Sequence, residues 1–146
     1  MAERGIDVVR AHLAKLPPPE SLTIAERRAQ YERAEKVFPT PPEVKIERVT
    51  APRVPAEWLR PPSAAPGRSV LYLRGGGYVI GSPRSHRHLA AAIATAAGAS
   101  ALLLEYRCAP EAPFPAAVDD CFAAVQWASA AQPVPASQAS TPASHA

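Results

Sequence analysis

Helically spaced apolar residues mark the first part of the chain. Within residues 3–16 they recur every three or four positions: Ile6, Val9, Leu13 and Leu16. Three consecutive prolines end that segment, because proline cannot continue a helix. A second helix is predicted from about Thr23 to Val37, since Thr23 and Glu26 form a Thr-x-x-Glu capping box. Residues 1–40 are therefore expected to form a helical segment that packs on a larger body.

The pattern changes to that of strands after residue 40. Residues 44–49 and 54–59 alternate roughly between apolar and polar positions, which predicts an antiparallel pair with one face in solvent. Residues 69–73 and 101–104 are short apolar runs, typical of strands that are buried on both faces. These runs predict the sheet around which the chain folds.

A helix is predicted between the two apolar runs. Ser85 is its candidate N-cap, and Gly98 is suited to end it. The segment is rich in alanine and places Leu89, Ile93 and Ala97 on one face. A strand, a helix and a strand in this order imply a parallel pair joined by a right-handed crossover.

The composition changes after a last predicted helix over residues 116–128. The apolar residues of that helix are Val118, Phe122, Val125 and Trp127. Residues 128–146 contain no acidic residue, lysine or arginine, and consist of alanine, serine, proline and a few other types. Such low complexity predicts a disordered tail. The ordered core is thus expected over residues 41–127.

Composition and charge narrow the class of protein. The chain has 146 residues, of which 47% are hydrophobic and 20% charged, as in a globular domain. The net charge of +3 is spread along the chain, so a nucleic-acid partner is not expected. There is no apolar run of about 18 residues and no signal-peptide core, so we expect no membrane span and a cytoplasmic location. Cys108 and Cys121 are expected to be buried or half-buried thiols without a disulfide.

The strongest candidate for chemistry is a glycine cluster at the exit of the predicted strand over residues 69–73. Arg74 is followed there by Gly75, Gly76 and Gly77. Glycines let backbone N–H groups approach a ligand closely, and such groups can stabilise an oxyanion during acyl transfer. A plain turn is the alternative interpretation.

Two phosphate-binding motifs fail by their spacing. A Gly-x-Gly-x-x-Gly fingerprint would begin at Gly75 and Gly77, but its last position is Ile80. A P-loop would span Gly76 to Gly81, but serine and proline follow where lysine is required. A nucleotide-binding βαβ protein is therefore disfavoured.

Several motifs in order resemble one esterase family. They are Tyr72-Leu73-Arg74-Gly75-Gly76-Gly77-Tyr78, Gly81-Ser82, Glu105-Tyr106-Arg107-Cys108-Ala109-Pro110-Glu111, Phe114-Pro115-Ala116-Ala117 and Asp119-Asp120. The chain resembles the hormone-sensitive-lipase family of α/β-hydrolases, which shows His-Gly-Gly-Gly, Asp-Tyr-Arg-Leu-Ala-Pro-Glu and Phe-Pro-Ala at similar spacing. The match covers about residues 44–127, and residues 1–40 resemble the family's cap segment.

The resemblance implies a fold and an activity. It implies a partial α/β-hydrolase fold, with a mostly parallel sheet, an N-terminal antiparallel strand pair and flanking helices. It implies hydrolysis of small acyl esters through a serine acyl-enzyme, without a metal or cofactor. Gly76 and Gly77 would supply the oxyanion-hole amides, and Arg74 and Gly75 would belong to the oxyanion loop.

Two departures from the family qualify this expectation. Arg74 stands where the family has histidine, and no serine has glycine at both the −2 and +2 positions of a Gly-x-Ser-x-Gly elbow. We therefore expect the fold to stop before the nucleophile strand and residues 1–146 to be inactive alone. The strand at 69–73 would then be an open edge prone to self-association. A non-catalytic protein that binds acyl compounds or another protein is the alternative.

Other polar residues are expected to be structural. His86 and His88 are interpreted as surface or capping residues rather than metal ligands. Asp119 and Asp120 are adjacent on a helix and point to different sides, so one of them is expected to pair with a residue such as Arg107. The basic stretch over residues 84–88 is interpreted as a solvated loop, with contact to an anion as the alternative.

Overall fold

The computed structural model describes residues 6–7, 10–11, 13–15, 17–18 and 21–131. Of the helix predicted over residues 3–16, residues 6–7, 10–11 and 13 are helical, and residues 3–5, 8–9, 12 and 16 lie outside the described residues. The predicted tail over residues 128–146 lies outside the described residues from residue 132 onward. Residues 128–131 belong to a helix, so the tail does not begin at residue 128. None of the helices in the described part combines the length and apolarity that crossing a bilayer requires.

Four strands form one sheet in the described residues. They are β1 (Lys45–Ala51), β2 (Val54–Arg60), β3 (Ser69–Tyr72) and β4 (Ser100–Leu104), in the order β1-β2-β4-β3. The predicted hairpin of β1 and β2 and the predicted parallel pair of β3 and β4 are both confirmed. Because β2 also pairs with β4 antiparallel, the described sheet is mixed rather than mostly parallel. Only the single βαβ unit contributes a parallel pairing.

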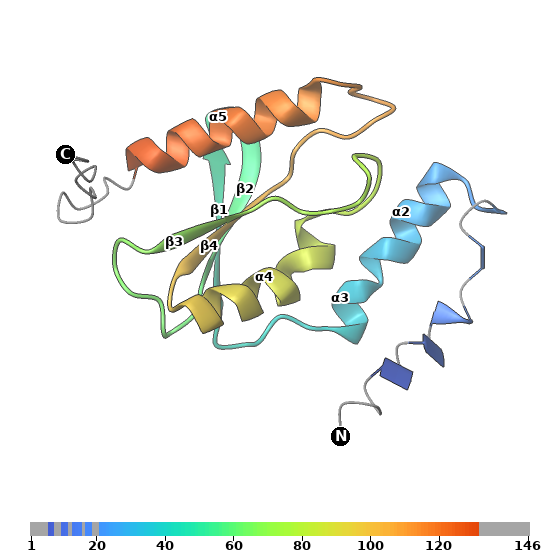
Figure 1. Ribbon diagram of the computed structural model, residues 1–146, viewed down its shortest axis with the longest axis horizontal. Coiled ribbons are helices and arrows are strands. Elements are labelled where there is room, and N and C mark those ends of the chain that lie inside the picture. The colour runs from blue at the N-terminus through green and yellow to red at the C-terminus, as the bar shows by residue number, and fades with distance from the viewer. Residues whose placement is uncertain (1–5, 8–9, 12, 16, 19–20, 132–146) are drawn as a thin grey trace, which may run out of the picture.

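The helices lie on both faces of this sheet (Figure 1). They are α2 (Ile24–Glu32), α3 (Ala34–Val37), α4 (Pro83–Ala97) and α5 (Ala116–Ala131). Side chains of β4 alternate between the faces: Ala101 and Leu103 join the core with α4, and Leu102 and Leu104 join the core with α5. β4 is thus buried on both faces, as predicted.

The strand β3 is less buried than predicted. Ser69 is exposed and the other three residues are half-buried, whereas every residue of β4 is buried. The difference follows from position, because β3 is the edge strand of the described sheet and has one neighbour. The open edge expected at residues 69–73 is therefore present in the described part of the chain.

The predicted second helix is present but divided. Thr23 caps α2, with its hydroxyl accepting from the Glu26 amide at 3.3 Å while the Glu26 carboxylate accepts from the Thr23 amide at 2.8 Å. The predicted capping box is thus confirmed. Arg33 separates α2 from the short α3. Both helices lie on the side of the molecule that carries α4 (Figure 1).

The prediction that Ser85 caps α4 was wrong. Ser82 is the N-cap, Pro83 occupies the first turn, and Ser85 completes a capping box by accepting from the Ser82 amide at 3.0 Å. Proline favours this earlier start because it needs no hydrogen-bond partner in the first turn. Gly98 ends the helix in the left-handed conformation with φ 57°, as predicted.

The face of α4 that carries Leu89, Ile93 and Ala97 is not the face that packs on the sheet. The sheet is covered by Ala90, Ala91 and Ala94, each fully buried, while Leu89 and Ile93 are exposed. Small side chains let a helix approach a sheet closely, so size alone did not indicate the buried face. In α5 the same holds: Ala117 and Ala124 are buried, and its large apolar residues Val118, Phe122 and Val125 are exposed.

Candidate active site: the glycine loop

The loop after β3 is shaped by its glycines. Gly76 has a φ of 128° and Gly77 a φ of 59°, both in the region that favours glycine. A Cβ atom on Gly76 would overlap the carbonyl oxygen of Ile80, whereas one on Gly75 would meet no atom within 4 Å. The sequence therefore requires glycine at position 76 for steric as well as conformational reasons. The turn is closed by the Gly76 carbonyl, which accepts from the Ile80 amide at 3.0 Å.

The amides of this loop remain available. Among the described residues, the backbone N–H groups of Gly75, Gly76 and Gly77 donate to no acceptor, because β3 and its ladder end at Tyr72. The loop lies at the carboxyl end of β3, beside α5 (Figure 1). Free amides at the end of a parallel strand are the arrangement that binding a negatively charged oxygen requires.

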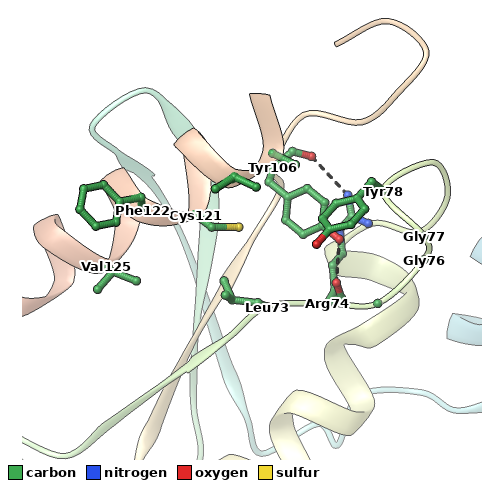
Figure 2. A pocket seen from close by; sticks show the side chains of 12 residues that line it. Leu73, Arg74, Gly76, Gly77, Tyr78, Tyr106, Cys121, Phe122 and Val125 are labelled. Atoms are coloured by element: carbon green, nitrogen blue, oxygen red, sulfur yellow. Dashed lines mark hydrogen bonds between the residues drawn. The ribbon is translucent and has the colours of Figure 1, made fainter. Parts of the chain in front are cut away.

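A cavity of about 580 Å³ opens beside these amides. Figure 2 shows it between the loop, Tyr106 and the side chains of α5. Its lining residues are Leu73, Arg74, Gly75, Gly76, Gly77, Tyr78, Tyr106, Ala117, Val118, Cys121, Phe122 and Val125. Apart from Arg74 these residues are apolar or uncharged, as is typical of a site for an organic ligand.

Arg74 lies beneath the loop and is 5% exposed. Its guanidinium donates to the carbonyl oxygens of Ile80 at 2.9 Å and Tyr106 at 3.3 Å, and to the Cys108 sulfur at 3.2 Å. The guanidinium carbon also lies 4.1 Å from the centre of the Tyr106 ring, a cation–π contact. Arg74 therefore joins the glycine loop to the segment that follows β4.

Tyr106 completes this clamp from the opposite direction. Its hydroxyl donates to the Arg74 carbonyl at 2.7 Å, which fixes the peptide that leads into Gly75 (Figure 2). Burial raises the pKa of the Tyr106 hydroxyl, so the group keeps its proton and remains a donor at neutral pH. Tyr78, at the far side of the loop, has a φ of 60°, a conformation unusual for a bulky residue.

Arg28 of α2 holds the loop from the other side. Its guanidinium donates to the carbonyl oxygens of Val79 and Ala109, both at 2.8 Å, and makes two bonds of 2.7 and 2.8 Å to the Glu111 carboxylate. The Arg28 hydrogen bond is the main reason that the pKa of Glu111 is lowered to about 2. One side chain of the N-terminal helices thus contacts both loops that border the site.

Comparison with known proteins decides the family. A family model described as the alpha/beta hydrolase fold matches residues 70–144, which is more than half of the chain. The chain belongs to this family. The resemblance to its hormone-sensitive-lipase branch is confirmed by human hormone-sensitive lipase, which is 42% identical over 72 residues, covering 49% of this chain and 7% of that protein.

Two bacterial relatives extend the match. An acetyl-hydrolase of Streptomyces hygroscopicus is 48% identical over 101 residues, 69% of this chain and 33% of the relative. The crystal structure of an esterase from the bacterial hormone-sensitive lipase family superposes with a TM-score of 0.77 at 41% identity, covering 91% of this chain and 43% of that one. The chain thus spans less than half of the length of these relatives.

The predicted role of the aspartate pair in this α/β-hydrolase chain is confirmed for Asp120. Its carboxylate accepts from the Arg107 backbone amide at 2.9 Å and from the Arg107 guanidinium at 2.8 Å. Burial by itself raises the pKa of Asp120, but the bonds from Arg107 outweigh it and the net pKa is lowered. Asp119 makes no ion pair or side-chain hydrogen bond within the described residues. The structural role is therefore carried by Asp120.

The interpretation of His86 and His88 as surface or capping residues was wrong for His86, which is buried. Its Nδ1 lies 3.1 Å from the Ser85 hydroxyl, and burial lowers the pKa of the imidazole. His88 is half-buried and stacks on Phe38 at 5.0 Å between ring centres. His86 lies beside Tyr31 of α2, and His88 beside Phe38 at the end of α3. The sequence pattern predicted a helix here but not that it packs against these two rings. No group of three potential metal ligands occurs within the described residues.

The basic stretch over residues 84–88 is not a solvated loop. It forms the first turns of α4, where Arg84 donates to Glu35 at 2.7 Å and Arg87 donates to Glu57 at 2.6 Å. Arg87 also reaches Glu35 at 3.0 Å. The charges of this stretch are therefore bound by carboxylates of α3 and β2.

Cys108 and Cys121 are free and half-buried, as expected.

Sequence reasoning missed two residues that shape the site. Tyr106 lies within the quoted Glu-Tyr-Arg motif, but nothing in the motif indicates that its hydroxyl reaches back to the glycine loop. Arg28 lies on the polar side of a predicted helix, where an arginine is ordinarily solvated. Only the folded chain brings these residues to Arg74 and Val79.

Proposed function

We propose that this chain forms the oxyanion-stabilising and acyl-binding part of a carboxylic-ester hydrolase. The observation that carries the proposal is the free amides of Gly76 and Gly77, held at the carboxyl end of β3 beside an apolar cavity. In this proposal the two amides donate to the ester carbonyl oxygen. Arg74 and Gly75 belong to the loop that aims them.

The chemistry follows from where charge develops. Attack on an ester carbonyl converts its oxygen into an oxyanion, and preorganised N–H donors stabilise that charge more than the neutral carbonyl. The apolar wall of Val118, Phe122 and Val125 suits an acyl chain. The names of the acetyl-hydrolase and esterase relatives support a small acyl ester as the substrate. The proposed chemistry uses no cofactor.

The nucleophile is the part of this mechanism that residues 1–146 do not supply. A serine acyl-enzyme needs an activated serine with a base and its orienting group, and no serine in the sequence lies in a Gly-x-Ser-x-Gly elbow. We therefore expect residues 1–146, assayed by themselves with a p-nitrophenyl ester, to show no turnover above background. Turnover that a serine-directed inhibitor abolishes would show that another serine of the chain acts as nucleophile.

The N-terminal helices are proposed to act as a cap over the loop. The three contacts of Arg28 support this role, because α2 holds Val79 and Ala109 through one side chain. In this proposal residues 1–40 form the cap segment, and residues 41–127 form the core that carries the glycine loop.

A chimeric enzyme tests the proposed function directly. Residues 44–127 would replace the matching segment of the Streptomyces hygroscopicus acetyl-hydrolase, which provides the remainder of a hydrolase chain. We expect this chimera to hydrolyse p-nitrophenyl acetate. Gly76→Ala in the chimera should lower kcat by at least about 100-fold, because its Cβ atom would clash with the Ile80 carbonyl and displace the amides from the oxyanion, while Gly75→Ala retains activity.

Counting functional sites separates this result from misfolding. Titration with a serine-directed inhibitor gives the number of active sites, so that kcat is expressed per folded site. A folded chimera without activity, or equal kcat values for the two alanine variants, would refute the oxyanion role. The alternative function, a protein that binds acyl compounds without catalysis, predicts an inactive chimera whose cavity still binds acyl ligands. The missing elbow serine is the observation that favours it.

A further inference from the structure

The charge of Arg74 is not neutralised by a carboxylate. No carboxylate of the described residues lies within 4.0 Å of its guanidinium nitrogens, and its Nε is buried without a hydrogen-bond partner. Its contacts are two carbonyl oxygens, one thiol and the Tyr106 ring. These groups are dipoles or a π face, so the full positive charge remains at the base of the loop.

Three other arginines of the described residues are bound by carboxylates. Arg28, Arg87 and Arg107 each contact a carboxylate at 2.8 Å or less. The carboxylate of Asp120, which acts electrostatically on Cys121 in the cavity wall, is itself bound by Arg107. Arg74 is the one ionised side chain among the residues that line the cavity. No carboxylate belongs to the residues that line this cavity, whereas Glu105 and Glu111 line a neighbouring hollow that Arg74 also borders.

Two sources of positive potential act on the same position. The amides of Gly76 and Gly77 have no acceptor among the described residues and both glycines line the cavity, which Arg74, a permanent cation, also lines. A neutral carbonyl oxygen gains a charge–dipole attraction from Arg74, whereas a carboxylate gains the stronger attraction between two full charges. In a partly buried site, a unit charge interaction is strong enough to favour the anion by about tenfold or more.

We propose that this cavity binds the carboxylate anion of short fatty acids in preference to neutral acyl compounds of the same size. The proposal rests on the proposed function, because it places the ligand oxygen on the same amides and the acyl chain against the same wall of α5. The volume of about 580 Å³ leaves room for a chain of several carbons. Arg74, where the family has histidine, makes this preference independent of pH above the range in which carboxylic acids ionise.

The test compares butyrate with butyramide, which has the same size but no charge. Both are titrated into ¹⁵N-labelled residues 1–146 at constant ionic strength, and the amide signals of Gly75, Gly76 and Gly77 are followed. We expect both ligands to shift these signals and butyrate to bind about tenfold more tightly. Equal affinities would overturn the anion preference and leave the proposed function standing. Failure of both ligands to shift the signals would remove the proposed function as well.

Variants assign the preference to Arg74. Arg74→Met should reduce butyrate affinity to that of butyramide, and Arg74→Lys, which keeps the charge, should retain most of the preference. Arg53→Met is the matched control, because it removes the same charge from an exposed residue that does not line the cavity. If Arg74→Met weakens both ligands equally, the residue only shapes the loop. The comparison on the unaltered protein decides the preference even if Arg74→Met fails to fold.

Discussion

At Gly76 the backbone takes a conformation that the rest of the loop depends on. The residue combines a φ of 128° with a close approach to the Ile80 carbonyl, and its own carbonyl closes the turn. The run of three glycines was visible in the sequence. The sequence did not indicate which of them the turn requires, because that depends on the position of Ile80.

Substitution of the two neighbouring glycines separates these requirements. Gly76→Ala should lower the free energy of unfolding by about 1–3 kcal/mol or more, because both the φ angle and the new Cβ atom are unfavourable. Gly75→Ala should change it by less than about 1 kcal/mol, since its Cβ atom meets open space. Urea unfolding followed by circular dichroism measures both values. Equal effects of the two substitutions would contradict the described loop.

At the level of helices and strands, the sequence predicted the type of each element better than the face that it buries. The βαβ unit, the hairpin and the capping box of α2 were predicted because each is a local pattern. The buried face of α4 was not, since alanines rather than Leu89 and Ile93 cover the sheet. The pairing of β2 with β4 and the attachment of α2 through Arg28 were also not predictable, because they join segments far apart in the sequence.

The attachment of α2 predicts a pH dependence. The pKa of Glu111 is lowered from 4.5 to about 2 by the Arg28 bond, so this ion pair stabilises the fold above pH 4.5 and its contribution is lost as the pH falls toward 2. Glu111→Gln should therefore lower Tm at neutral pH, and its difference from the unaltered protein should vanish near pH 2. Thermal unfolding across this pH range measures the difference.

A glutamate elsewhere provides the control for this experiment. Glu43 is exposed and forms no ion pair in the described part of the chain, so Glu43→Gln should leave Tm nearly unchanged at each pH. A deficit for Glu111→Gln that stays constant from neutral pH to pH 2 would argue against the ion pair as the attachment of α2.

For the molecule as a whole, the two edges of the described sheet differ. β1 carries Lys45, Glu47 and Arg48, and charged side chains protect an edge from pairing with another strand. β3 carries no charged residue, and Leu73 beyond it is 49% exposed. We propose that residues 1–146, as an isolated protein, associate through the β3 edge.

The cytoplasmic location and the disordered tail stay predictions.

Matched lysine substitutions test this association. Leu73→Lys places a charge beside the β3 edge and should shift the isolated protein toward monomer, by about tenfold or more in dissociation constant. Ile46→Lys makes the same change on the opposite edge strand, at a residue of similar exposure, and should have little effect. Sedimentation velocity over a range of concentrations distinguishes them. A monomeric unaltered protein, or the same response from both variants, would exclude the β3 edge as the contact.

Hydrogen exchange of single amides tests the central claim, that the glycine-loop amides are free to bind an oxyanion. We expect fast exchange at Gly76 and Gly77, which have no acceptor among the described residues, and slower exchange at Ile80 and Ala109, which donate at 3.0 and 2.8 Å. Added butyrate should slow exchange at the two glycines. Protection of Gly76 and Gly77 equal to that of Ile80 in the ligand-free protein would show that these amides are already bound and not free for an oxyanion.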